Sequence, residues 1–175
     1  LAANGSERTL LRRVMPAHSS WHIIADEYLP GERGLVKVQG AVSGAIIGTI
    51  MQYGRTSSGG ISYLYGVQLQ EPVAENYRAS YNTFLGQSCD LMLVNARHEP
   101  INVTLEMSNF NGEHPIPAKS VQIPAEGMLV ERVCDLDVAN RYGVLSISSD
   151  QRGALVGSLI RLGLADQYRF PTPVR

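Results

Sequence analysis

The sequence predicts an all-β protein built from antiparallel, immunoglobulin-like β-sandwich repeats. Apolar and polar residues alternate along short segments, which places the apolar side chains on one face of a half-buried strand. Turn signals such as Asn111-Gly112 and Arg152-Gly153 separate these segments by about 8–12 residues, the spacing of a sandwich or barrel. No segment has the length and composition of a helix. We interpret Asp135–Tyr142, with its weak helix formers, as a turn or a single helical turn.

The alternation predicts individual strands in both parts of the chain. In the first part the segment is Leu35–Gln39. In the second part the predicted strands are Cys89–Asn95, Ile101–Ser108, Lys119–Pro124, Met128–Cys134, Gly143–Ser149 and Ala154–Leu162. That number of strands is typical of an immunoglobulin-like sandwich. Asn111-Gly112 predicts a type I′ hairpin turn, because Asn followed by Gly accommodates positive φ at both central positions.

An internal duplication relates the two parts. Glycines at 34, 44, 48 and 54 are matched by glycines at 143, 153, 157 and 163, with the same spacing of 10, 4 and 6 residues. Further matches pair Asn4-Gly5 with Asn111-Gly112 and Met15-Pro16-Ala17 with Ile123-Pro124-Ala125. The offset between matched residues drifts only from 107 to 109, by subtraction of their numbers, so we expect one-residue changes in loops and an otherwise constant register.

The duplication predicts two units of unequal completeness. Residues 73–175 form a complete sandwich repeat, whereas residues 1–72 form a partial repeat without counterparts of the first two strands, Cys89–Ser108. Strands without neighbours expose backbone polar groups and an apolar face. Three sources of cover remain open: protein upstream of Leu1, residues of roughly 61–85 folding back, or strands donated by another chain.

Composition and charge restrict the class of function. The chain has a net charge of −1 with no basic stripe, which argues against a nucleic-acid partner. No apolar run approaches the roughly 20 residues that span a bilayer, so we expect no membrane span. Because the chain opens on Leu1 without a basic and apolar leader, we expect a mature product or a fragment.

The complete repeat resembles the tandem immunoglobulin-like or adhesin-like β-sandwich modules of bacterial secreted and surface proteins. The resemblance rests on the ordered series Leu91–Asn95, Val103–Leu105, Asn111-Gly112, Ile123–Gly127, Tyr142–Leu145, Ser149-Asp150 and Gly153–Gly157. Such modules generally act as spacers, stalks or attachment units. The resemblance implies no catalytic residue and no cofactor.

Cys89 and Cys134 are the two cysteines of the chain. Cysteines in a non-cytosolic β-domain are commonly joined, and the partial repeat carries Ala25 at the position of Cys134, as expected if a cysteine is kept only beside its partner strand. A disulfide between them would stabilise the folded state by about 3–4 kcal/mol, because it closes a loop in the unfolded chain. The alternative is a pair of buried thiols acting as small apolar side chains.

Aromatic residues form the candidate interaction surface: Trp21, Tyr53, Tyr63, Tyr65, Tyr77 and Tyr81. Exposed tyrosines stack on saccharides or pack on a partner. The alternative is that they are strand residues bridging the two repeats. His18 and His22 lie four apart without a nearby carboxylate or cysteine at ligand spacing, so we expect no metal site.

These observations favour a non-catalytic structural or interaction module of a secreted or cell-surface protein, assembling through strand or sandwich packing into an array or filament. Its expected partners are further protein, by self-association or from adjoining domains. The second hypothesis is a carbohydrate- or ligand-binding module using the tyrosine-rich region between the repeats. An enzyme is disfavoured, because no acid, base or metal-ligand set has diagnostic spacing.

Overall fold

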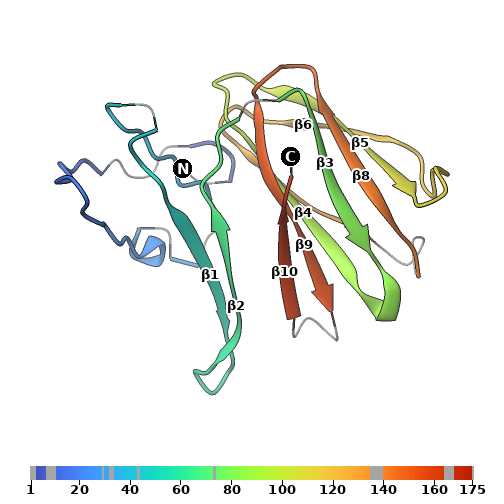
Figure 1. Ribbon diagram of the computed structural model, residues 1–175, viewed down its shortest axis with the longest axis horizontal. Helices are drawn as coiled ribbons and strands as arrows, with labels where there is room; N and C mark the ends of the chain where they lie inside the picture. Colours follow the sequence, from blue (N-terminus) through green and yellow to red (C-terminus); the bar gives the residue numbers. More distant parts are fainter. Residues whose placement is uncertain are drawn as a thin grey trace.

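The computed structural model describes residues 3–6, 11–28, 30–31, 34–42, 44–72, 74–134, 140–163 and 168–174 (Figure 1). Its strands are β1 (Thr49–Arg55), β2 (Ile61–Gln68), β3 (Asn76–Asn82), β4 (Ser88–Asn95), β5 (Ile101–Asn109), β6 (Lys119–Ile123), β7 (Met128–Cys134), β8 (Tyr142–Ser149), β9 (Leu155–Gly163) and β10 (Tyr168–Pro173). Two short 3₁₀ turns, η1 (Ala25–Glu27) and η2 (Phe84–Gly86), are the helical elements of the described residues.

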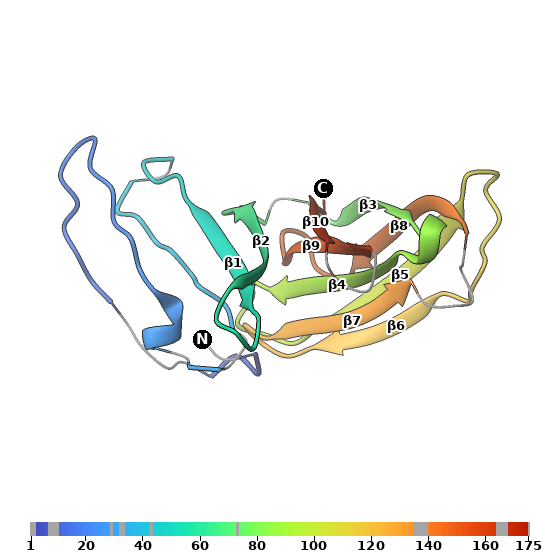
Figure 2. The same ribbon diagram turned by 90° about the horizontal axis from the view of Figure 1, so that it is seen from below.

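Strands β3 to β10 form a sandwich of two four-stranded antiparallel sheets. One sheet has the strand order β10-β9-β4-β7 and the other β3-β8-β5-β6. β1 and β2 form a separate antiparallel hairpin, which stands between the sandwich and the long loops of the N-terminal half (Figures 1 and 2). The prediction of an all-β, antiparallel sandwich is confirmed.

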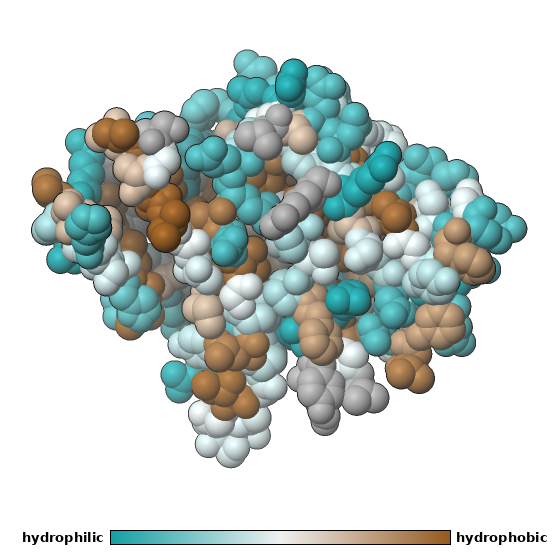
Figure 3. Space-filling view, viewed as in Figure 1, coloured by the Kyte–Doolittle hydropathy of each residue, from teal (hydrophilic) through white to brown (hydrophobic). Residues whose placement is uncertain are grey.

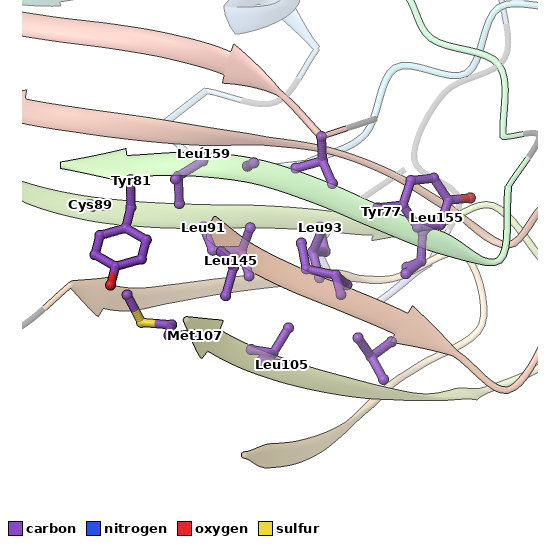
Figure 4. Packing of buried hydrophobic residues seen from close by; sticks show 14 of the residues in the cluster. Tyr77, Tyr81, Cys89, Leu91, Leu93, Leu105, Met107, Leu145, Leu155 and Leu159 are labelled. Carbon is purple, nitrogen blue, oxygen red and sulfur yellow. The ribbon is translucent and has the colours of Figure 1, made fainter. Parts of the chain in front are cut away.

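The core lies between the two sheets, and the alternation of the sequence supplies it. β5 buries every second residue from Ile101 to Met107, and its intervening side chains are more exposed. Leu91 and Leu93 of β4 meet Leu145 of β8 in the middle of this layer (Figure 4). Burial of apolar area of this kind is the main favourable contribution to folding.

Six predicted strands agree with β4 to β9 to within a residue or two at each end. β3 and β10 were not predicted. β3 offers only Tyr77, Ala79 and Tyr81 as its buried series, and β10 contains Pro171 and Pro173, which normally argue against a strand. The prolines are accommodated because β10 is the edge strand of its sheet.

Two local predictions are corrected by the structure. Leu35–Gln39 is not a strand, although it alternates well. At the Asn111-Gly112 turn, Gly112 has positive φ (86°) but Asn111 does not, so the turn is not type I′. Instead the Asn109 side chain accepts hydrogen bonds from the backbone N–H groups of Asn111 and Glu113. Residues 135–139 of the predicted turn at Asp135–Tyr142 lie outside the described residues.

The hairpin packs on the outer face of the sandwich through β2. Tyr65 is buried with Ile160 and Leu162 of β9 in a small second cluster. The guanidinium of Arg169 lies 3.9 Å from the centre of the Tyr63 ring, a cation–π contact between β10 and β2. Residues 61–85 therefore do not complete the first repeat. Part of this stretch pairs with β1, and β3 pairs with β8 of the sandwich.

Candidate functional site

The turns of the N-terminal half repeat those of the sandwich in backbone geometry. Four residues with left-handed backbone in residues 3–72 have left-handed counterparts at the repeat offset of 107–109, by subtraction of residue numbers. The pairs are Gly5 and Gly112, His18 and Glu126, Gly31 and Asn140, and Gly44 and Gly153. His18 and Glu126 are the most telling pair, since neither is glycine and residues other than glycine uncommonly have positive φ.

Hydrogen bonds are repeated as well. The Ser19 N–H donates to the Pro16 carbonyl at 3.2 Å, as the Gly127 N–H donates to that of Pro124 at 3.0 Å. The β1–β2 hairpin is the counterpart of β9–β10, for Gly54 pairs with Tyr63 as Gly163 pairs with Tyr168. The two hairpins also end with equivalent hydrogen bonds. In the β1–β2 hairpin the Leu69 N–H donates to the Gly48 carbonyl at 2.9 Å, and in β9–β10 the Val174 N–H donates to the Gly157 carbonyl at 3.0 Å.

What the N-terminal half does not repeat is the strands between these turns. The counterparts of β6, β7 and β8 lie near residues 11–15, 20–25 and 34–40, and none of them is a strand. In the sandwich, β6 pairs with β5, β7 pairs with β4, and β8 pairs with β3 and β5. The first repeat has no β3, β4 or β5. Every strand pair of the sandwich except β9–β10 includes β3, β4 or β5. The counterpart of β9–β10 is the β1–β2 hairpin, and it is the pair that forms in the N-terminal half.

The absent strands leave apolar side chains exposed. Met15, Val36, Val38 and Ile46 are 39–48% exposed, whereas their counterparts Ile123, Leu145, Ile147 and Leu155 are at most 1% exposed. Apolar surface accordingly gathers over the N-terminal half, on the left of Figure 3. A row of apolar side chains left outside a core in this way is typical of an interaction surface.

Contacts at one turn attach this half to the sandwich. The Met128 N–H donates to the Ala3 carbonyl at 2.8 Å, and Lys37 Nζ lies 2.7 Å from Glu126 Oε1. His98 Nδ1 is 3.4 Å from the same carboxylate oxygen. The hydrogen bond from Lys37 is the main cause that lowers the pKa of Glu126. These polar contacts add to the contact of the hairpin with β9 and leave the four apolar side chains exposed.

The predicted aromatic surface is not one surface. Tyr77 and Tyr81 lie near opposite ends of the sandwich core (Figure 4), and Tyr65 is buried against β9. These three are therefore not surface residues, because the sandwich and the hairpin contact cover them. Tyr63 stacks on Tyr65 of the same strand at 6.0 Å and contacts Arg169 of β10, as expected of a residue bridging the two parts.

The other two aromatic candidates are accessible but apart from any shared site. Tyr53 is 48% exposed, and the Arg55 guanidinium lies 5.7 Å from its ring centre. Trp21 is partly buried, with Arg13 at 5.5 Å from its ring centre. Each aromatic ring thus pairs with a nearby arginine, which gives local cation–π contacts rather than a common platform.

Cys89 and Cys134 form a disulfide between the adjacent strands β4 and β7, with their Cα atoms 4.8 Å apart. Both residues are buried in the core. The bridge fixes β4, the strand whose counterpart the first repeat lacks, to its neighbour. Ala25 stands at the position equivalent to Cys134, where no partner strand is present.

The described residues contain no cluster of three or more His, Cys, Asp or Glu side chains that could hold a metal ion. His18 and His22 are both exposed. Among the helices of the described residues, none is long and apolar enough to cross a bilayer.

A second feature lies at the far end of the sandwich, where a hollow of about 250 Å³ is lined by Phe84, Asn109, Phe110, Asn111, Glu113, Asn140, Arg141 and Tyr142. The rings of Phe110 and Tyr142 stack with centres 5.1 Å apart, and both are exposed. Hydrogen bonds from Asn109 and then Asn111 lower the pKa of Glu113. Sequence reasoning missed this group, because its aromatic residues are far apart in the chain.

No protein-family model matches the chain, and no curated protein matches it. Among solved structures, it is similar to the crystal structure of Thermotoga maritima 1070. The two chains are 16% identical, with a TM-score of 0.46, over 59% of this chain and 94% of that one. A likeness this distant carries no argument about function.

Proposed function

We propose that the chain is a non-catalytic structural and interaction module of a secreted or cell-surface protein, and that it assembles with further protein through β-strand and sandwich packing. One observation carries the proposal. Residues 3–72 hold the turns and the terminal hairpin of a sandwich repeat and expose the side chains that the sandwich buries. A half-repeat of this kind can bind another protein segment that supplies the missing strands.

The same observation supports tandem repeats, with residues 1–72 as the later part of one repeat and residues 73–175 as the next. In a tandem array each repeat contacts its neighbours, as the β1–β2 hairpin contacts β9 here. The disulfide supports an oxidising compartment, because such bonds rarely persist in the cytosol.

Localisation and redox state test this function together. Intact cells of the source organism are labelled with an impermeant amine reagent, and the culture medium is collected in parallel. We expect the protein in the labelled or secreted fraction, with no reactive thiol at Cys89 or Cys134 when it is alkylated without reductant. A protein confined to the cytosol with both thiols free would contradict the proposal.

The hollow beside Phe110 and Tyr142 favours a second candidate function, the binding of a glycan. Exposed aromatic faces next to amide and charged side chains suit a sugar, which offers an apolar ring face and hydroxyl groups. A glycan array run with the chain and with Tyr142→Ala tests it, and Tyr53→Ala serves as the matched control on the hairpin. Binding that is absent, or unchanged by Tyr142→Ala, counts against this candidate.

A further inference from the structure

We propose that the N-terminal half binds a three-stranded polypeptide segment patterned like Asn76–Asn109, that is, like β3, β4 and β5, and that this segment lies outside these 175 residues. The inference rests on the proposed function and deepens it, because it names the partner and the register in which the partner pairs. It also extends the prediction from two missing strands to three, because the structure shows that β3 belongs to the unit.

The pairing scheme of the sandwich identifies the partner. β4 pairs with β7 and β9, β5 with β6 and β8, and β3 with β8. These three consecutive strands therefore contact every strand whose counterpart is missing or incomplete in the N-terminal half. β4 and β5 alone reach all four of these strands, and β3 supplies the second neighbour of β8.

Glycines of the first repeat match the approach of the absent strands. A Cβ atom on Gly143 would lie 1.9 Å from the Ser108 carbonyl oxygen of β5, and one on Gly157 would lie 2.5 Å from the Met92 carbonyl oxygen of β4. Both positions thus need glycine because β5 and β4 come so close. Their counterparts Gly34 and Gly48 are also glycines, although neither strand is present; at Gly48 a Cβ atom would also lie 2.5 Å from the Leu69 side chain.

The register follows from the duplication. Leu91 and Leu93 of β4 pair with Leu159 and Gly157 of β9. In the first repeat Ile50 and Gly48 take the places of Leu159 and Gly157. The incoming strand therefore runs antiparallel to β1 and sets a leucine-like side chain opposite each of these two residues. Among the described residues β1 pairs with β2 alone, so its other edge is available to the incoming strand.

A second copy of this chain is a poor donor of the segment. The β3, β4 and β5 strands of every copy are already part of its own sandwich, where Leu91 and Leu93 are fully buried. The Cys89–Cys134 bridge also holds β4 on β7. Exchange between two copies would open one core in order to close another, and an additional segment of the same pattern avoids that cost.

Completion also changes the contact of the hairpin. The face of β9–β10 that carries Leu159 and Val174 looks into the sandwich core. The matching face of the hairpin, which carries Tyr65, packs instead on the outer side of β9 against Leu162. The same face cannot line a core of its own and contact Leu162, so binding of the segment moves Tyr65 away from β9.

The experiment adds a peptide of residues 74–109 with Cys89→Ser to the full chain and follows backbone hydrogen exchange. We expect a 1:1 complex in which residues 36–40 and 46–55 exchange at least about tenfold more slowly, because exchange there requires the new ladder to open. The control peptide carries Leu91→Asp and Leu93→Asp, which removes the apolar face, and should have no effect.

A second arrangement guards against a peptide that is insoluble. The same 36 residues, joined to the start of the chain through a flexible linker, raise the effective concentration of the segment to the millimolar range. Unchanged exchange in both arrangements would overturn the inference, as would a dimer of the chain alone that already protects residues 46–55. Neither outcome alters where the protein is found or its thiol state, so the proposed function is judged separately.

Discussion

Asn95 offers the sharpest test of how the sandwich is held together. It is a fully buried polar side chain at the end of β4. Its Nδ2 donates to the carbonyl oxygens of Glu99 and Pro124 at 2.7 and 2.8 Å, and its Oδ1 accepts the Arg97 N–H at 2.8 Å. One amide therefore joins β4 to the loop that follows it and to the turn between β6 and β7.

Asn95→Ala removes these three bonds and a longer one from Nδ2 to the Ile123 carbonyl at 3.4 Å. A typical hydrogen bond contributes about 1 kcal/mol, and a buried group left without a partner costs more, so the free energy of unfolding should fall by about 3 kcal/mol. Asn95→Asp keeps the shape of the side chain but sets a buried carboxylate against two carbonyl oxygens. A buried charge without a compensating partner lowers the free energy of unfolding by about 3–5 kcal/mol.

The Asp variant also has a pH signature. The carbonyl oxygens and burial raise the pKa of the new carboxyl in the folded state, so its destabilisation is largest above that pKa and declines as the pH falls through it. Urea unfolding followed by circular dichroism at neutral and acidic pH measures both effects. Asn102→Ala, which removes an exposed bond to Asp150, is the control and should cost less than about 1 kcal/mol.

The reasoning about Asn95 fails under either of two results. The first is a loss below about 1 kcal/mol for Asn95→Ala, comparable to the Asn102→Ala control. The second is an Asp variant whose deficit relative to the parent protein is the same at acidic and neutral pH.

Three further changes have defined outcomes. Replacing Cys89 and Cys134 by alanine should lower the free energy of unfolding by about 4 kcal/mol, because the closed loop spans 45 residues; an unchanged urea midpoint would contradict this. Tyr81→Phe should leave stability unchanged or raise it by up to about 1 kcal/mol, since the buried Tyr81 hydroxyl has no hydrogen-bond partner among the described residues; a clear loss in the same assay would reveal a partner. Acidification through the lowered pKa of Glu126 should release Lys37. The stabilisation by the Lys37–Glu126 ion pair is fully present above the ordinary carboxyl pKa and is lost as the pH falls below the pKa of Glu126 in the folded protein. Hydrogen exchange at residues 36–38 should rise by an amount that corresponds to less than about 1 kcal/mol, and Glu126→Gln should remove the pH dependence.

Sequence reasoning predicted most of the sandwich because its strands are locally explicit. Ile101–Asn109 alternates without interruption, and one face of it is buried as expected. β3 was missed because Tyr77 and Tyr81 also suit a surface, and only pairing with β8 decides that they are buried. The sequence of one strand does not reveal which other strand it pairs with, and so it does not reveal which of its residues are buried.

The same limit explains the error at Leu35–Gln39. Val36 and Val38 alternate as well as Leu145 and Ile147 do, but a strand exists only when a neighbour accepts its hydrogen bonds. The duplication predicts that neighbouring strands are missing from the N-terminal half. It could not indicate that the turns at Pro16–Ser19 and Gly44 keep their geometry without those neighbours.

The disulfide has a mechanical consequence for a module that bears tension between its ends. It joins two residues 45 positions apart, and at about 3.4 Å per residue it withholds roughly 150 Å of chain from any extension. A pulled sandwich that loses its fold would therefore lengthen only by the polypeptide outside the bridge. The withheld length becomes available when the bond is reduced, so the redox state of the surroundings sets how far the module can stretch.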